Sequence, residues 1–229
     1  MRKSRLIIFA ALEMETRAAA KALSIPFLPK SVLKHATAPI ELHTIGMRAV
    51  RLPALLPSLS PSSADRIWMI GLAGALDPAL RVGDLVIDFD PPAPTTPLAT
   101  DASIRQGRIH TCDQLVAVPA EKRALFAQTR ALAVDMEQRI VRDRLTPLGI
   151  GVVGIRSISD TADTPLDPAL PRLIDASGRP KWPALAGALL RRPILVVPLI
   201  RLGRDSSRAL RELAKAIACL AASDPAMSE

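Results

Sequence analysis

GVVGIRSISDTAD, at residues 151–163, joins an apolar run to an acidic turn. Its first part, residues 151–158, is rich in Val and Ile and predicts a strand, which Asp160 closely follows. Strands of this composition are typical of a mainly parallel sheet that is covered on both faces. Open sheets of this class bind ligands beyond the carboxyl ends of their strands. The stretch therefore predicts an α/β fold with Asp160 at a ligand site.

Apolar runs and helical segments alternate along the rest of the chain. The other predicted strands are residues 6–12, 40–45, 67–72 and 109–116, and residues 80–88 are predicted to be a turn that leads into a strand. The predicted helices are residues 15–23, 48–59, 120–129 and 136–144, and the Pro-rich residues 89–103 predict a loop. Strands that alternate with helices indicate βαβ units around a mostly parallel sheet. We expect residues 1–229 to form a single domain.

The carboxyl-terminal third has a different character. Residues 164–205 begin as a loop and continue as a small apolar helix at 182–190, and Pro193 and Pro198 argue against one continuous helix through the next stretch. Residues 206–222 predict an amphipathic carboxyl-terminal helix. We interpret residues 164–205 as a basic apolar insertion.

Charge and cysteine content exclude several classes of protein. The net charge is +8, and residues 179–215 hold nine Lys and Arg against two acids, so +7 of it lies in that segment. A nucleic-acid-binding domain would more often be basic in its main body, so we expect no nucleic-acid partner. Cys112 and Cys219 are expected to be free thiols in a reducing cytoplasm. Three histidines without a Cys/His cluster make a zinc site improbable.

The amino terminus resembles the start of a signal peptide only briefly. The apolar run at 6–12 ends at Glu13, whereas a secretory signal continues to a small-residue cleavage site. No apolar run approaches the roughly 18 residues of a membrane span. We therefore expect a cytoplasmic protein, with peripheral attachment to the inner face of the membrane as an open alternative.

Four stretches in this order resemble the nucleoside phosphorylase and nucleosidase family. They are Leu12-Glu13-Met14-Glu15, Ala73-Gly74-Ala75-Leu76-Asp77-Pro78, Val134-Asp135-Met136-Glu137 and Ser157-Ile158-Ser159-Asp160-Thr161-Ala162-Asp163. The resemblance implies a three-layer α/β/α nucleoside phosphorylase-like fold with a central mixed, mainly parallel sheet. It also implies cleavage of a purine–ribose bond without a cofactor or a metal.

The resemblance implies a role for each acid. The first Asp of the family's Ser-Asp-x-Ala-Asp motif, here Asp160 after Ser159, faces N7 of the purine and acts as the acid. Glu137 would hold the ribose hydroxyls, and Met136 would pack on the sugar. Glu15 would orient and deprotonate the attacking water. Arg17 and Arg48 lie nearby in sequence, so a phosphate pocket stays open as an alternative.

The purine pocket is implied less completely, because the chain departs from the family pattern. Ala73 and Gly74 would bring the backbone close to the nucleoside, but Leu72 stands where the family has Ser or Thr. Leu115 replaces an aromatic residue that often stacks on the base, Val116 would line the base pocket through its backbone, and Ser159 would be a further purine contact. Asp135 replaces the usual first Glu of Val-Glu-Met-Glu.

Residues 164–205 resemble the hopanoid-associated branch of this family. The matching motifs are Asp175-Ala176-Ser177-Gly178-Arg179, Arg191-Arg192-Pro193 and Arg204-Asp205-Ser206-Ser207-Arg208. That branch is associated with the removal of adenine from adenosylhopane, which leaves ribosylhopane. Apolar side chains flanked by Arg suit an anionic membrane surface. The predicted lipid or membrane contacts are Arg191, Arg192, Arg201, Leu195 and Leu199.

Three alternatives stay open at this point. The enzyme could be a phosphorylase that uses phosphate in place of water. The protein could be a non-catalytic lipid- or nucleic-acid-binding relative on the same fold, although Glu15, Glu137 and Asp160 argue against a pure binder. The basic segment could be an ordinary insertion with a solvated face. Whether the protein forms a homodimer, and whether a neighbouring subunit completes the site, also stay open.

Overall fold

The computed structural model describes residues 4–27, 33–34, 39–89, 104–168, 170–175, 179, 181–191, 194 and 196–223. These residues form a nine-stranded sheet. Seven of its strands follow the order β2-β3-β1-β4-β9-β5-β6; the other two are β8, which pairs with β4, and β7, which pairs with β8. The strands are β1 (Leu6–Ala10), β2 (Leu33–Lys34), β3 (Ile40–Thr44), β4 (Arg66–Ala75), β5 (Leu85–Asp88), β6 (Ile104–Gln106), β7 (Ile109–Thr111), β8 (Ala133–Asp135) and β9 (Val152–Asp160).

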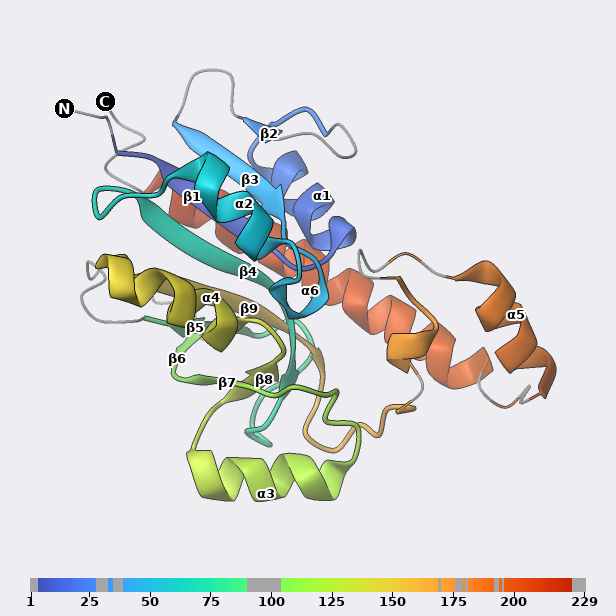
Figure 1. Ribbon diagram of the computed structural model, residues 1–229. Coiled ribbons are helices and arrows are strands. Elements are labelled where there is room, and N and C mark those ends of the chain that lie inside the picture. The colour runs from blue at the N-terminus through green and yellow to red at the C-terminus, as the bar shows by residue number, and fades with distance from the viewer. Residues whose placement is uncertain are drawn as a thin grey trace.

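Helices cover both faces of this sheet, as Figure 1 shows. They are α1 (Glu13–Ala22), α2 (Leu52–Leu59), α3 (Pro119–Thr129), α4 (Gln138–Leu145), α5 (Trp182–Arg191) and α6 (Val196–Ala222), with 3-10 turns η1 (Met47–Ala49), η2 (Thr146–Leu148) and η3 (Leu170–Arg172). Leu6 and Ile8 of β1 pack with α1 and α6, whereas Ile7 and Phe9 pack with α2 and α4. Burial on both faces explains why this strand lacks polar alternation.

The sheet is mixed and mainly parallel. β1 pairs in parallel with β3 and β4, β4 with β9, β5 with β6, and β7 with β8. The antiparallel pairs are β2 with β3, β4 with β8, and β5 with β9. The predicted three-layer α/β/α architecture is confirmed. Because β1, β4 and β9 run in one direction, their carboxyl ends meet at a single edge of the sheet.

Several predicted boundaries are wrong. The strand predicted at 109–116 ends at Thr111, because its partner β8 ends at Asp135 and the chain there turns into α4. The helix predicted at 48–59 is divided, since Arg48 adopts a left-handed φ of 54° and α2 begins only at Leu52. Most of the loop predicted at 89–103 lies outside the described residues.

The carboxyl-terminal helix is longer than predicted. It begins at Val196 rather than at residue 206, because Pro198 falls in the first turn, where proline removes no intrahelical hydrogen bond. Leu213 and Ile217 are fully buried against α1 and the sheet. The first turns of α6 project with α5 beyond the edge of the sheet (Figure 1).

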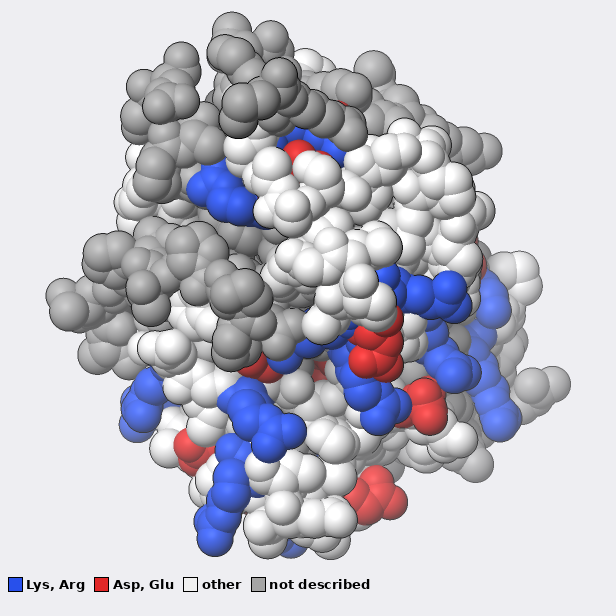
Figure 2. All heavy atoms as spheres, turned by 60° about the vertical axis from the view of Figure 1, so that its left-hand side comes forward, with Lys and Arg blue, Asp and Glu red and all other residues white. Residues whose placement is uncertain are grey.

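Two surface properties bear on the expected partners. Among the helices of the described residues, none is long and apolar enough to cross a membrane. On the face drawn in Figure 2, Lys and Arg side chains lie among Asp and Glu side chains rather than in one continuous basic patch.

Candidate active site

Three carboxylates from separate stretches lie near the carboxyl ends of β4 and β9. Glu15 belongs to the first turn of α1, Glu137 directly precedes α4, and Asp160 is the last residue of β9. All three are buried, with exposed fractions of 3%, 7% and 6%. Burial of three acids at one sheet edge is costly unless each is hydrogen-bonded, so their partners define what the site can do.

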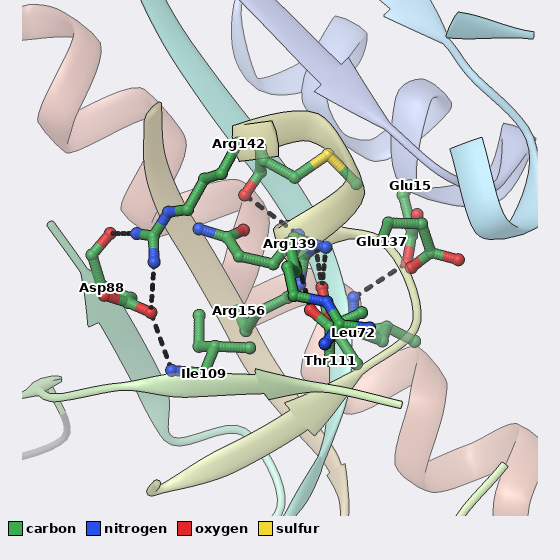
Figure 3. Close-up of polar contacts among 12 residues, drawn as sticks. Glu15, Leu72, Asp88, Ile109, Thr111, Glu137, Arg139, Arg142 and Arg156 are labelled. Carbon is green, nitrogen blue, oxygen red and sulfur yellow. Dashed lines mark hydrogen bonds and ion pairs between the residues drawn. The ribbon is translucent and has the colours of Figure 1, made fainter. Parts of the chain in front are cut away.

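Glu15 is held entirely by backbone donors. Its Oε1 accepts the N–H of Leu72 at 2.8 Å (Figure 3), and its Oε2 accepts the N–H of Leu12 at 2.8 Å. Burial raises the pKa of Glu15, while these two N–H groups oppose the rise. Gly71 makes this position accessible, since a Cβ there would lie 2.7 Å from Glu15 Oε1. The carboxylate therefore fills a backbone pocket that the end of β4 provides.

Glu137 lies beside Glu15, as Figure 3 shows. Its Oε1 accepts the backbone N–H of Arg48 at 2.8 Å, which uses the left-handed turn at Arg48 described above. Burial and then the negative charge of Asp135 raise the pKa of Glu137 to about 7, against the opposing effects of Arg156 and the Arg48 N–H. Glu137 therefore changes its charge near neutral pH.

A buried arginine under these acids was not predicted. Arg156 of β9 is 1% exposed; its Nη2 contacts Asp135 Oδ2 at 2.5 Å and its Nη1 donates to the Met69 carbonyl at 2.9 Å. Asp135 also accepts from Thr111 Oγ1 and the Gln138 N–H. The cation partly offsets the charges of both Glu15 and Glu137. A single Arg within a strand rich in Val and Ile was the available signal.

Asp160 has a partner on each carboxylate oxygen. Ser159 Oγ donates to Oδ1 at 2.8 Å, and Lys122 Nζ donates to Oδ2 at 2.5 Å. Gly74 of β4 comes so close that a Cβ there would lie 3.0 Å from Oδ2. Sequence reasoning missed Lys122, because nothing in its helix distinguishes it from a solvated lysine.

A cavity of about 410 Å³ adjoins Asp160. Its wall continues from Ser159 and Asp160 along the loop after β9 to α5 and the first turns of α6. The polar lining residues are Thr164, Asp167, Arg201 and Asp205; the apolar ones are Pro165, Leu166, Leu170, Leu173, Ala188, Val197, Pro198, Leu199 and Leu202. The cavity therefore has Asp160 at the sheet edge, and its helix side is mainly apolar apart from Arg201 and Asp205 of α6.

The other residues predicted to contact the sugar or the purine differ in how deeply they are buried. Met136, Leu115 and Val116 are half-buried, and Ala73 is buried and accepts a hydrogen bond from Ser159 Oγ at 3.3 Å. Val116 packs against the cluster of Leu76, Ala131 and Val134.

The predicted lipid contacts are only partly described. Leu199 and Arg201 line the cavity. Arg192, Leu195 and the side chain of Arg191 lie outside the described residues. Arg179, from the same basic segment, binds Glu13 of α1 at 2.5 Å, and this lowers the pKa of Glu13.

Comparisons of the chain with known proteins identify its fold. No protein-family model matches the chain, and no curated protein matches it. Among solved structures, the chain is similar to the 5′-methylthioadenosine/S-adenosylhomocysteine nucleosidase of Helicobacter pylori with butyl-thio-DADMe-Immucillin-A. The identity is 17%, the match covers 97% of this chain and 98% of that one, and the TM-score is 0.61.

Two further solved structures agree. The native futalosine hydrolase of Helicobacter pylori strain 26695 matches with 16% identity over 96% of both chains and a TM-score of 0.59. A putative 5′-methylthioadenosine/S-adenosylhomocysteine nucleosidase of Francisella philomiragia matches with 18% identity over 96% of this chain and 99% of that one, with a TM-score of 0.61. The chain therefore has the nucleoside phosphorylase-like α/β fold that these proteins share.

Proposed function

We propose that the protein is a purine nucleosidase that hydrolyses the N-glycosidic bond of a 5′-substituted adenosine. The observation that carries the proposal is the place of Glu15. Its carboxylate occupies the backbone donors of Leu12 and Leu72, beside Glu137. Phosphate would need such donors for itself and would meet two acids instead. A buried carboxylate there suits the activation of a water molecule, which disfavours the alternative of a phosphorylase.

The three acids divide the reaction between them. Glu15 takes a proton from the water that attacks the anomeric carbon, and burial makes this carboxylate a stronger base. Glu137 accepts hydrogen bonds from the 2′ and 3′ hydroxyls, and Met136 packs on the sugar. Asp160 gives a proton to N7, so the purine leaves as a neutral molecule. General acid and base groups each contribute about 10²- to 10⁴-fold to the rate.

The proposed binding site for the purine is formed by the neighbours of Asp160. Gly74 and Ala73 bring backbone to the acid, and Ser159 fixes its Oδ1. Leu115 and Val116 follow β7 and supply apolar contact to the base. These assignments favour a nucleosidase over a non-catalytic binder, because three buried acids serve no purpose in holding a neutral lipid.

The substrate that we propose is adenosylhopane, which yields ribosylhopane and adenine in hopanoid biosynthesis. With the purine at the Asp160 end of the cavity, the wall formed by Leu199, Leu202 and Ala188 is left for the 5′ substituent. An apolar wall favours a hydrocarbon over a charged amino acid group, since each buried CH₂ contributes about 0.8 kcal/mol.

A lipid substrate also fits the outer surface of the α5–α6 hairpin. Large apolar side chains are exposed there, namely Trp182, Leu190, Ile194, Val196, Val197 and Ile200. Arg201 and Arg204 flank them and are exposed as well. Apolar groups beside arginines favour reversible attachment to an anionic membrane surface. We therefore propose a peripheral position at the membrane from which the substrate is taken.

The proposal is tested by comparing two substrates, adenosylhopane in mixed micelles and soluble 5′-methylthioadenosine. We expect adenine release from both, with the larger kcat/KM for adenosylhopane. Leu199→Asp places a charge in the apolar wall and should lower kcat/KM for adenosylhopane far more than for 5′-methylthioadenosine. Equal losses for both substrates would argue against a hydrocarbon at this wall, and adenine release from neither would refute the nucleosidase.

A further inference from the structure

Lys122 is the most deeply buried cation beside the site, and sequence reasoning gave it no role. It lies in the first turn of α3 with no exposed surface. Its Nζ donates to Asp160 Oδ2 at 2.5 Å, to the Thr161 carbonyl at 2.8 Å and to the Thr164 carbonyl at 3.2 Å. An ammonium has three donors, so each of them has an acceptor. The side chain is therefore protonated and fixed in one position.

Asp160 is fixed equally well. Ser159 Oγ holds Oδ1 at 2.8 Å while Lys122 holds Oδ2. Gly74 leaves just enough space for the carboxylate at the end of β4. Because Thr161 and Thr164 lie in the loop that follows β9, Lys122 also connects the start of this loop to α3. The pair is thus a rigid unit that faces the cavity through Asp160, which lines it.

An aspartate alone is a poor acid at neutral pH. With an ordinary pKa of about 3.9, roughly one in a thousand such carboxyls carries a proton at pH 7. An ammonium ordinarily keeps its proton to about pH 10. The direct hydrogen bond between the two gives a path by which the ammonium proton can reach the carboxylate.

We propose that Lys122 is a positioning residue that supplies the proton that Asp160 passes to the purine. This inference rests on the proposed nucleosidase function. As the C1′–N9 bond breaks, its electron pair moves into the purine, the proton of Lys122 Nζ passes to the Asp160 carboxylate, and Asp160 passes a proton on to N7. Lys122 is then neutral, and Asp160 is again a carboxylate. The water oxygen bonds to C1′, and Glu15 takes the water proton. Lys122 and Glu15 then return to their starting charge by proton exchange with solvent.

Other charged groups face this pair and must be considered. Arg123 of α3 pairs with Asp163 at 3.2 Å, and both side chains are exposed. From the loop and α6, Asp167, Arg201 and Asp205 line the cavity beside Asp160. Glu121 adds an acid to the first turn of α3. These groups border solvent or the open cavity, where charges are screened, whereas Lys122 contacts the carboxylate directly.

The test is the pH profile of kcat for adenine release from 5′-methylthioadenosine, between about pH 5 and about pH 9. Each variant is compared with wild type at the same pH, because Glu137, whose pKa is raised to about 7, acts on all the profiles alike. Lys122→Met, a chain of similar length without charge, should lose at least about tenfold more rate at the alkaline end than at the acid end, with KM little changed. Lys122→Arg should not restore the rate, because a guanidinium does not release its proton. Arg123→Met, at the next position of the same helix, is the matched control and should keep the wild-type profile.

Each outcome distinguishes a proton-supplying role of Lys122 from a purely structural one. A Lys122→Met profile parallel to wild type, reduced equally at every pH, would show that Lys122 only stabilises the loop. If Lys122→Met does not fold, Lys122→Arg decides: a wild-type rate in that variant overturns the proposal, because its guanidinium does not release a proton. Adenine release at no pH by the wild type refutes the nucleosidase itself, and the proton role with it.

Discussion

Glu137→Gln should stabilise the protein in a pH-dependent way. The folded-state pKa of Glu137 is raised from 4.5 to about 7, so the fold prefers the neutral carboxyl. For a raised pKa, the stabilisation is fully present below about 4.5 and is lost as the pH rises through about 7. At 1.36 kcal/mol per pKa unit, ionisation of Glu137 costs the fold roughly 3 kcal/mol at about pH 8. Gln is neutral at every pH and still accepts the Arg48 N–H.

The assay is the free energy of unfolding from urea titrations between about pH 4 and about pH 8. The difference between Glu137→Gln and wild type should shift by roughly 3 kcal/mol in favour of the variant as the pH rises. Only this change with pH tests the reasoning, because any constant offset has other causes. Glu121→Gln, at an exposed position of α3, is the control and should follow wild type. A difference that does not vary with pH would refute the account of burial and repulsion at Glu137.

The remaining predictions concern activity and binding. Asp160→Asn should lower kcat for adenine release about 10²- to 10⁴-fold without unfolding the protein, because an amide is not acidic enough to protonate N7; wild-type turnover by a folded variant would remove Asp160 from the mechanism. Gly71→Ala should displace the Glu15 carboxylate, since the new Cβ would lie 2.7 Å from Oε1. Turnover assays should then show a loss of activity that the change in thermal stability does not account for. Wild type should sediment with anionic liposomes at low salt and be released at high salt, whereas Leu190→Asp with Ile200→Asp should stay in the supernatant yet cleave 5′-methylthioadenosine normally. Equal retention of this variant would argue against the α5–α6 surface.

The strands at the centre of the fold were predictable because both of their faces are buried. β1 appears in the sequence as a continuous apolar run and β9 begins as a stretch rich in Val and Ile, and both strands are buried almost throughout. The limits of β7 and α6 were not predictable in the same way. β7 ends where its partner strand ends, and α6 starts earlier because Pro198 falls in a first turn.

The candidate site shows a similar division. The positions of Glu15, Glu137 and Asp160 at the sheet edge followed from motifs that end strands or begin helices. Lys122 did not, because its partner Asp160 lies 38 residues further along the chain and its own helix has no pattern that marks a buried cation. Arg156 of β9 pairs with Asp135 of β8, a residue far away in sequence, so only its unusual place in an apolar strand could have identified it.

The central claim is that water, and not phosphate, attacks the sugar. It is tested most directly by measuring adenine release from 5′-methylthioadenosine in phosphate-free buffer and with phosphate in excess, with the sugar product followed by phosphorus NMR. The account predicts equal rates in both buffers and a sugar without phosphate, because Glu15 occupies the backbone donors of Leu12 and Leu72. Turnover that requires phosphate and yields a sugar 1-phosphate would contradict it.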